Sequence, residues 1–217
     1  MTFNAEVFQI TVLSLQISAL ATGLSLLIGL PLGTLLALGR IRGRAFLLSL
    51  VNTGMGLPPV VVGLFVAMTL WRSGPLGDLR LIYTPAAIVI AQVIISFPIV
   101  TGLTAAALQS LDPRMRLQLY GLGASRLQMV WALWKEVRLP LLAALMAGFG
   151  SVISEVGASM MVGGNIRYQT RVLTTAIVLE TSKGRFETAL ALGILLLVIT
   201  FAVNWIFTSI QQRSARR

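Results

Sequence analysis

A single carboxylate inside an apolar stretch is the clearest candidate for chemistry in this sequence. Glu155 lies in the otherwise uncharged run from about Leu139 to Val162, and a charged group near the centre of a bilayer costs about 2.5 to 3.5 kcal/mol. An ionised carboxylate repels anions, so direct ligation of an anionic solute is a poor fit. We expect a structural role, with bonds to hydroxyls, backbone donors or an arginine. A gating contact and a contact with a solute stay open as alternatives.

Two residue types that carry much of protein chemistry are missing from the chain. The sequence contains neither histidine nor cysteine, which argues against zinc, haem and histidine-based catalytic centres and against disulfides. It also lacks the G-x-x-x-x-G-K-[ST] phosphate-binding loop. We therefore expect no enzymatic activity, no metal site and no cofactor in this chain.

Composition places the chain in the membrane. Of its 217 residues, 56% are hydrophobic and only 11% are charged, whereas about 25% of a soluble domain is charged. A span needs roughly 20 mostly apolar residues. The sequence predicts one all-α, polytopic transmembrane domain over residues 1–217, with about five spans: Val7–Leu38, Ala45–Trp71, Ile82–Leu111, Leu139–Val162 and Thr188–Ile210.

The basic residues predict the orientation of these spans. The net charge of +10 is attributed to cytoplasmic loops and anionic lipid headgroups rather than to nucleic acid. Most of the 17 basic residues lie in three segments, and a chain with five spans would place all three segments on the same side of the membrane. We expect the N-terminus outside and the C-terminus in the cytoplasm. The three segments contain Arg40, Arg42 and Arg44; then Arg114, Arg116, Arg126, Lys135 and Arg138; and finally Arg213, Arg216 and Arg217.

The segment 171–186 does not fit this scheme of spans. Its apolar part, Val172–Leu179, is too short to cross a bilayer. A sixth span would also move the basic tail outside, against the positive-inside rule. We expect a short helix that lies at the outer surface or re-enters the membrane there, shielded by protein.

Glycine and proline interrupt the predicted spans. They occur at Gly29, Pro31 and Gly33, at Gly56, Pro58, Pro59 and Gly63, and at Pro98. Glycine lets helices approach closely, and proline bends a helix and frees a carbonyl group. The pattern allows either ordinary helix packing or bent helices around a pathway.

The longest polar segment between spans covers residues 112–138. Asp112-Pro113 predicts a helix start, with aspartate as the cap and proline at the first helical position. Gly121 and Gly123 predict a turn, and residues 124–137 a second, amphipathic helix. Its apolar face is expected to contain Leu127, Val130, Trp131 and Trp134. Such a loop fits either a groove on a soluble partner or the membrane surface.

Two features of this loop resemble a known family. Gly121-Leu122-Gly123-Ala124-Ser125, followed by Leu139-Pro140, is similar to the cytoplasmic loop of ABC importer permeases, which carries an acidic-Ala-Ala triplet, a glycine and a later Leu-Pro. In this sequence Leu117-Gln118-Leu119 stand at the positions of the triplet. Pro140 lies 17 residues after Gly123, about one helical turn beyond the family's usual spacing. The resemblance implies a type I importer fold and a coupling helix that contacts an ATPase subunit, formed by Tyr120, Gly121, Leu122, Gly123, Ala124, Ser125 and Arg126.

A second stretch resembles one branch of that family. Residues 154–166, from Ser154-Glu155-Val156-Gly157 to Gly163-Gly164-Asn165-Ile166, together with 169–177, look like molybdate and tungstate permeases, and most like the tungstate type. The resemblance implies a homodimer in a bacterial or archaeal plasma (inner) membrane. It also implies two ATPase subunits, which bind ATP and Mg²⁺, and an extracytoplasmic substrate-binding protein.

Polar residues after the fourth span are candidates for the outer mouth. Asn165, Arg167 and Arg171 would contact the binding protein, steer a dianion through their long-range field, or lie solvated at the interface. Tungstate is the expected substrate. Molybdate, sulfate or another small solute is the alternative within the class, and a membrane scaffold or enzyme is the alternative outside it.

Overall fold

The computed structural model of the chain describes residues 3–39 and 41–215. Arg40, Arg216 and Arg217, three of the basic residues assigned to the cytoplasmic side, lie outside the described residues. The described chain is all-helical, as predicted. Its helices are α1 (Phe3–Leu38), α2 (Arg44–Met55), α3 (Pro59–Leu70), the short 3-10 helix η1 (Gly77–Leu79), α4 (Pro85–Gln109), α5 (Pro113–Gly121), α6 (Arg126–Glu136), α7 (Arg138–Ile153), α8 (Gly157–Gly163), α9 (Leu173–Ser182) and α10 (Phe186–Ala215).

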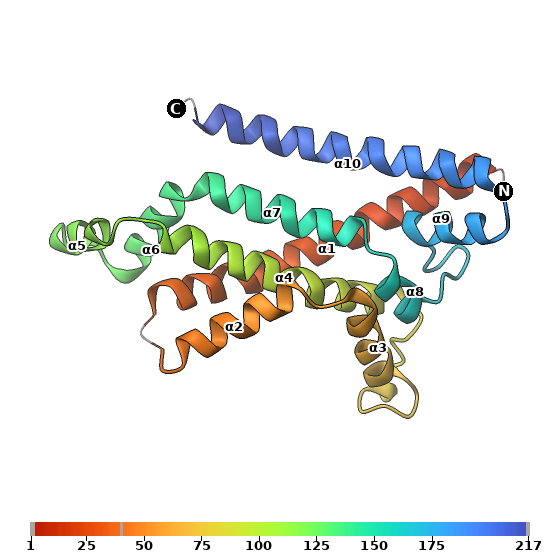
Figure 1. Cartoon of the computed structure of the whole chain (residues 1–217), viewed down its shortest axis with the longest axis horizontal. Coiled ribbons are helices and arrows are strands. Elements are labelled where there is room, and N and C mark those ends of the chain that lie inside the picture. The colour runs from red at the N-terminus through yellow and green to blue at the C-terminus, as the bar shows by residue number, and fades with distance from the viewer. Residues whose placement is uncertain (1–2, 40, 216–217) are drawn as a thin grey trace.

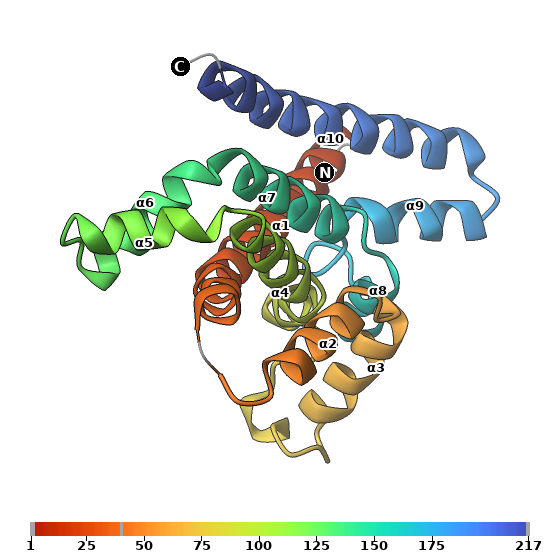
Figure 2. The ribbon, with the colours of Figure 1, turned by 60° about the vertical axis from the view of Figure 1, so that its left-hand side comes forward.

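The long helices form an elongated bundle. Helices α1, α4 and α7 contact one another in its centre, and α10 runs along one side (Figure 1). Helices α5 and α6 project at one end, where the C-terminus also lies, and the N-terminus lies at the other end with α9 (Figures 1 and 2). The fold thus separates one end built from α5 and α6 from a second built from α8, α9 and the start of α1.

Three helices are long and apolar enough to cross a membrane: Ala5–Leu38, Pro85–Gln109 and Phe186–Gln212. The described residues give up to five spans when two bent helix pairs are each counted as one. The first pair, α2 with α3, bends by 100°, and the second, α6 with α7, bends by 74°. The prediction of about five spans is confirmed when each bent pair is counted as one span.

Two of the predicted spans consist of broken helices. Residues 45–71 divide at Gly56–Pro58, because Pro58 is extended and Pro59 begins a new helix. Residues 139–162 divide at Ser154–Val156, between α7 and α8. Helix α1 instead continues through Pro31, and α4 continues through Pro98.

Close packing explains two of the glycines in α1. A side chain at Gly33 would lie 2.6 Å from the backbone oxygen of Thr101 in α4, and one at Gly29 would lie 3.0 Å from Val100. Both glycines are four residues apart, so they present one face to α4. Gly29 and Gly33 therefore serve helix packing, whereas Gly56 and Pro58 mark the break between α2 and α3.

Helix α9 has the length expected of the ambiguous segment. It covers ten residues, and its first turn is buried at Leu173, Thr174, Thr175 and Ala176. It lies beside the start of α10 at the N-terminal end of the bundle (Figure 1). The remainder is more exposed, so the protein shields the first half of the helix.

Candidate functional site

Glu155 lies in the break between α7 and α8 rather than inside a helix. Its side chain is 7% exposed, and its Oε1 accepts a hydrogen bond from the backbone N–H of Ala158 at 2.9 Å. Thr174 in α9 donates its hydroxyl to the Glu155 backbone carbonyl at 2.8 Å. Both contacts satisfy groups that the broken helix leaves without an intrahelical partner.

The two breaks in the bundle meet. A side chain at Gly157, directly after the second break, would lie 2.6 Å from Val60 at the start of α3. A side chain at Gly63 in α3 would lie 2.7 Å from the Cα of Ala158. Discontinuous helices that meet inside a bundle are the places where transport proteins build pathways and gates.

Gln92 in α4 faces the same region, and sequence reasoning missed it. Its amide nitrogen donates to the carbonyl of Val152 at 3.3 Å and to the Ser159 hydroxyl at 3.4 Å. Its Oε1 is buried without a hydrogen-bond partner, in a cavity of about 10 Å³ that Glu155 also lines. A polar residue at the centre of a long apolar run is the signal that could have identified it.

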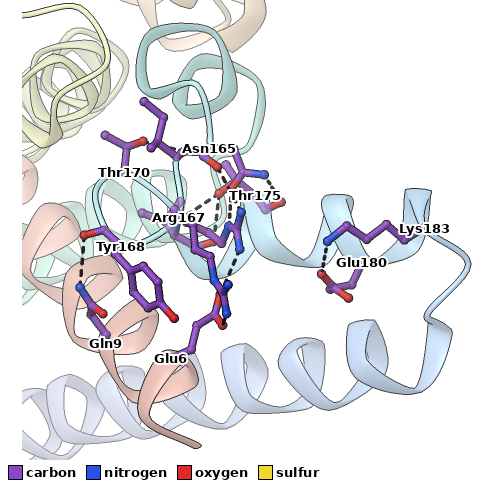
Figure 3. A network of polar contacts seen from close by, with 12 residues as sticks. Glu6, Gln9, Asn165, Arg167, Tyr168, Thr170, Thr175, Glu180 and Lys183 are labelled. Atoms are coloured by element: carbon purple, nitrogen blue, oxygen red, sulfur yellow. Dashed lines mark hydrogen bonds and ion pairs between the residues drawn. The ribbon is translucent and has the colours of Figure 1, made fainter. Parts of the chain in front are cut away.

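At the N-terminal end, Glu6 in α1 joins the two arginines predicted for the outer mouth. Arg167 donates from Nε to Glu6 Oε1 at 3.0 Å, and Arg171 donates from Nη1 to the same oxygen at 3.1 Å. Figure 3 shows Glu6 reaching Arg167 across the gap between α1 and the loop before α9. The hydrogen bond and charge of Glu6 raise the pKa of Arg167. Sequence reasoning missed Glu6, because the partners lie about 160 residues apart.

Asn165 supports this cluster from the loop. Its Oδ1 accepts from Arg171 Nε at 3.3 Å, and its Nδ2 donates to the Thr175 carbonyl at 3.4 Å. The structure thus brings Asn165, Arg167 and Arg171 together. The Arg171 side chain is only 15% exposed, whereas that of Arg167 is 55% exposed, so Arg167 is the arginine that faces the surroundings.

At the opposite end, α5 and α6 form the predicted helix, glycine turn and helix. Asp112 caps α5 by accepting from the Arg114 N–H at 2.8 Å, and Gly123 takes a left-handed conformation with φ of 77°. Ser125 and Gln128 form a reciprocal capping box at the start of α6. The Ser-x-x-Gln spacing in the sequence is the signal for this cap.

The loop exposes large apolar side chains. Leu122 and Leu127 are each 83% exposed, and Leu117, Tyr120 and Trp131 of the same loop are also exposed. A patch of this kind on a projecting loop marks a contact surface for another macromolecule or for the membrane. The predicted coupling residues 120–126 lie within it.

Part of the predicted apolar face of α6 points away from the bundle. Met129, Leu133 and Val137 are the buried residues of this region, whereas Leu127 and Trp131 point away from the core. Val130 and Trp134 are half-buried at the margin. Helical periodicity gives two apolar faces here, and only tertiary packing decides which one is covered.

Three side chains connect the loop and α2 to the C-terminal part of α1. Trp134 donates its indole N–H to the Thr34 hydroxyl at 2.9 Å, and Arg116 donates to the Ala37 carbonyl at 3.4 Å. Arg44 donates to the Leu36 carbonyl at 2.6 Å. Basic side chains at the C-terminal end of α1 satisfy its last carbonyl groups.

Fold and site together define a class of protein. Long apolar helices, two broken segments that meet in the bundle and a projecting loop are the features of a membrane transport subunit. The family described as "Binding-protein-dependent transport system inner membrane component" matches residues 29–216. The chain belongs to this family of multi-pass inner-membrane ABC transporter permeases, which are transport components rather than enzymes.

Several curated proteins are similar over nearly the whole chain. The chain is 38% identical to the "Probable anion ABC transporter permease protein" of Haloferax volcanii, covering 96% of this chain and 92% of that protein. It is also 38% identical to the "Tungstate uptake system permease protein TupB" of Peptoclostridium acidaminophilum, covering 97% and 92%. Identity to the Escherichia coli K12 "Molybdenum transport system permease protein ModB" is 26%, covering 96% and 97%.

A solved structure shares the fold. A chain of the MetNI methionine ABC transporter in an inward-facing conformation superposes with a TM-score of 0.76, and the match covers 99% of each chain. Sequence identity is 17%, so this likeness concerns the fold alone. It confirms the predicted importer permease fold.

Proposed function

We propose that this chain forms the translocation pathway of an ABC importer for a tetrahedral oxyanion, and that tungstate is the substrate. The observation that carries the proposal is the 38% identity to a tungstate uptake permease over 97% of the chain. The identity to a molybdenum permease is 26% over a similar length. That difference favours tungstate over molybdate.

The composition of the spans agrees with a passage that holds its cargo weakly. The five predicted spans contain no lysine or arginine, and Glu155 is their one charged residue. A dianion passing these spans therefore meets hydroxyl and backbone groups rather than a fixed positive charge. Strong binding and selection among oxyanions would then belong to the substrate-binding protein.

The proposed assembly is a homodimer with two ATPase subunits and one substrate-binding protein. The span of α10 is almost entirely outside the core of the single chain, and Phe46 and Leu50 of α2 are also exposed. These surfaces need lipid or a second copy to cover them. Two-fold symmetry would place a pathway between the two copies.

We assign ATPase docking to the α5–α6 loop. Residues Tyr120 to Arg126 lie at its tip, beside the exposed Leu117, Leu127 and Trp131. The basic residues Arg114, Arg116, Arg126, Lys135 and Arg138 are in the same loop, which favours the cytoplasmic side. This orientation places the C-terminus inside and the N-terminus, with Glu6 and Arg167, outside.

Substrate-stimulated ATP hydrolysis tests this function. The complex of this chain, its ATPase and its binding protein would be reconstituted in lipid, with tungstate, molybdate and sulfate supplied separately. We expect tungstate to stimulate hydrolysis at the lowest concentration. If molybdate or sulfate stimulates hydrolysis at a lower concentration than tungstate does, that anion is the substrate instead of tungstate. Stimulation by none of the three would contradict the oxyanion assignment.

A further inference from the structure

We propose that a basic pocket between α1, α9 and α10 binds the phosphate headgroup of an anionic phospholipid at the N-terminal end of the bundle. This site lies at the opposite end of the bundle from the coupling loop (Figure 1). It does not depend on the identity of the transported substrate.

The pocket is open and has a volume of about 650 Å³, a size that suits a small polar group. Four basic side chains line it: Arg167, Arg171, Lys183 and Arg185. The apolar part of its wall consists of Val7, Ile10, Ala176 and Leu192. A pocket with cationic and apolar walls matches an amphiphile better than it matches a fully hydrated ion.

Two carboxylates leave part of this charge unbalanced. Glu6 pairs with Arg167 and Arg171, and Glu180 pairs with Lys183 at 2.9 Å and with Arg185 at 3.6 Å. Figure 3 shows the Glu180–Lys183 pair at the end of α9 and the Glu6–Arg167 pair between α1 and the loop before α9. Four cations thus face two anions, and the guanidinium of Arg185 remains 67% exposed.

The position of the pocket indicates which anion it meets. By length and composition, the candidate spans start at Ala5 in α1 and at Phe186 in α10, directly after Lys183 and Arg185. The pocket therefore lies at the ends of both candidate spans, where they approach the membrane–water boundary. Phosphate groups of lipids are concentrated at this depth, and basic pockets between membrane helices bind them.

The adjoining surface suits the rest of a lipid molecule. Beyond the pocket, α10 exposes Leu190, Ile194, Leu197, Val198 and Phe201. Acyl chains can cover such a surface, whereas a free oxyanion gains nothing from it. This difference is the reason for choosing a lipid over an inorganic anion.

Native mass spectrometry of the full chain in detergent tests the proposal, with equimolar phosphatidylglycerol and phosphatidylcholine as probes. We expect the wild type to retain phosphatidylglycerol preferentially, and Lys183→Gln/Arg185→Gln to lower its apparent affinity for this lipid about tenfold, because each basic group near a headgroup contributes substantially. Glu180→Gln removes a competing carboxylate and should increase retention.

A matched control keeps the change in net charge but moves it elsewhere. Arg72→Gln/Arg80→Gln alters two exposed arginines in the loop between α3 and α4, and it should leave lipid retention unchanged. The thermal unfolding midpoint without lipid shows that each variant is folded. If Lys183→Gln/Arg185→Gln is unfolded, Arg185→Gln alone and the opposite effect of Glu180→Gln decide the question.

Three results would overturn the proposal. The first is equal retention of phosphatidylglycerol by the wild type and both pocket variants. The second is displacement of the lipid by millimolar inorganic phosphate or tungstate, which would make the pocket a site for free oxyanions. The third is loss of the bound lipid whenever two chains associate, which would make a second copy the occupant.

Discussion

The indole N–H of Trp134 in α6 donates to the hydroxyl of Thr34 in α1 at 2.9 Å. Thr34 donates its own proton to the Leu30 carbonyl at 2.7 Å, so the two bonds connect the projecting loop to the interior of a membrane-spanning helix. A displacement of α6 by a docked partner would therefore reach α1 directly.

Loss of this bond should weaken coupling more than folding. Trp134→Phe keeps an aromatic side chain, though a smaller one, and removes the N–H donor; loss of the hydrogen bond alone costs about 0.5 to 1.5 kcal/mol in stability. In the reconstituted complex we expect tungstate uptake per ATP hydrolysed to fall about two- to fivefold. Trp205→Phe, an exposed indole on α10, is the control and should change nothing.

A double-mutant cycle separates this link from a general effect on the loop. Thr34→Val should reproduce the coupling defect, and the double variant should be no worse than either single variant, because all three lack the same bond. Additive defects in uptake per ATP would mean that Trp134 and Thr34 act independently, contrary to our interpretation.

Glu155 should tolerate an amide but not an apolar side chain. Glutamine retains an oxygen that can accept from the Ala158 N–H, whereas leucine leaves this buried donor unsatisfied, at a cost of about 1 to 3 kcal/mol. We expect Glu155→Gln to keep normal membrane abundance and uptake within about twofold of wild type. Glu155→Leu should lower the unfolding midpoint and the abundance.

The same pair of variants distinguishes a structural role from a gating role. Normal abundance of Glu155→Gln with no uptake would show that the charge itself is required. In that case the bond to α8 would not explain why a carboxylate is present.

Two glycines of α1 provide a matched test of helix packing. Gly33→Ala would place a Cβ 2.6 Å from the Thr101 carbonyl oxygen, and Gly23→Ala would meet nothing within 4 Å. We expect the first change to destabilise the protein by about 1 to 3 kcal/mol through overpacking, and the second to be neutral or slightly stabilising. Thermal unfolding in detergent measures both. Equal effects would contradict the close approach of α1 to α4.

Glu180 should contribute a pH-dependent part of the stability. The hydrogen bond from Lys183 holds the pKa of this carboxyl below its ordinary value. Its folded-state pKa is thus lower than its unfolded value, so the stabilisation is complete above the unfolded pKa and is lost as the pH falls through the folded pKa. Between pH 7 and pH 3, the unfolding midpoint of wild type should fall more than that of Glu180→Gln.

The partner of Glu180 provides a second variant for this titration. Lys183→Gln removes the donor of the hydrogen bond and should also weaken the dependence on pH. An unchanged pH dependence in Glu180→Gln would show that the Lys183 bond does not contribute to stability.

Features that depend on local sequence were predictable. Apolar length identified the long helices α1, α4 and α10, and Asp112, Pro113 and the glycines identified the helices of the loop. These signals act within one or two helical turns, where capping and backbone conformation decide the outcome. The short length of α9 was likewise predictable from the short apolar run Val172–Leu179.

Features that depend on contacts between distant segments were not predictable. Glycine and proline occur in α1, α3 and α4 alike, but only packing shows that Gly33 approaches Thr101 while Pro58 ends a helix. The partner of Arg171 is Glu6, at the opposite end of the sequence. The choice between the two apolar faces of α6 also depends on what α1 and α4 cover.

ATP-driven accumulation of tungstate is the most direct test of the proposed function. Proteoliposomes would contain the complete complex with ATP and Mg²⁺ in the lumen, and the binding protein with tungstate outside. We predict luminal accumulation that requires ATP, the binding protein and an intact α5–α6 loop, and that exceeds accumulation of molybdate and sulfate at equal concentration. Equal tungstate entry with and without ATP, or preferential accumulation of another anion, would contradict the account.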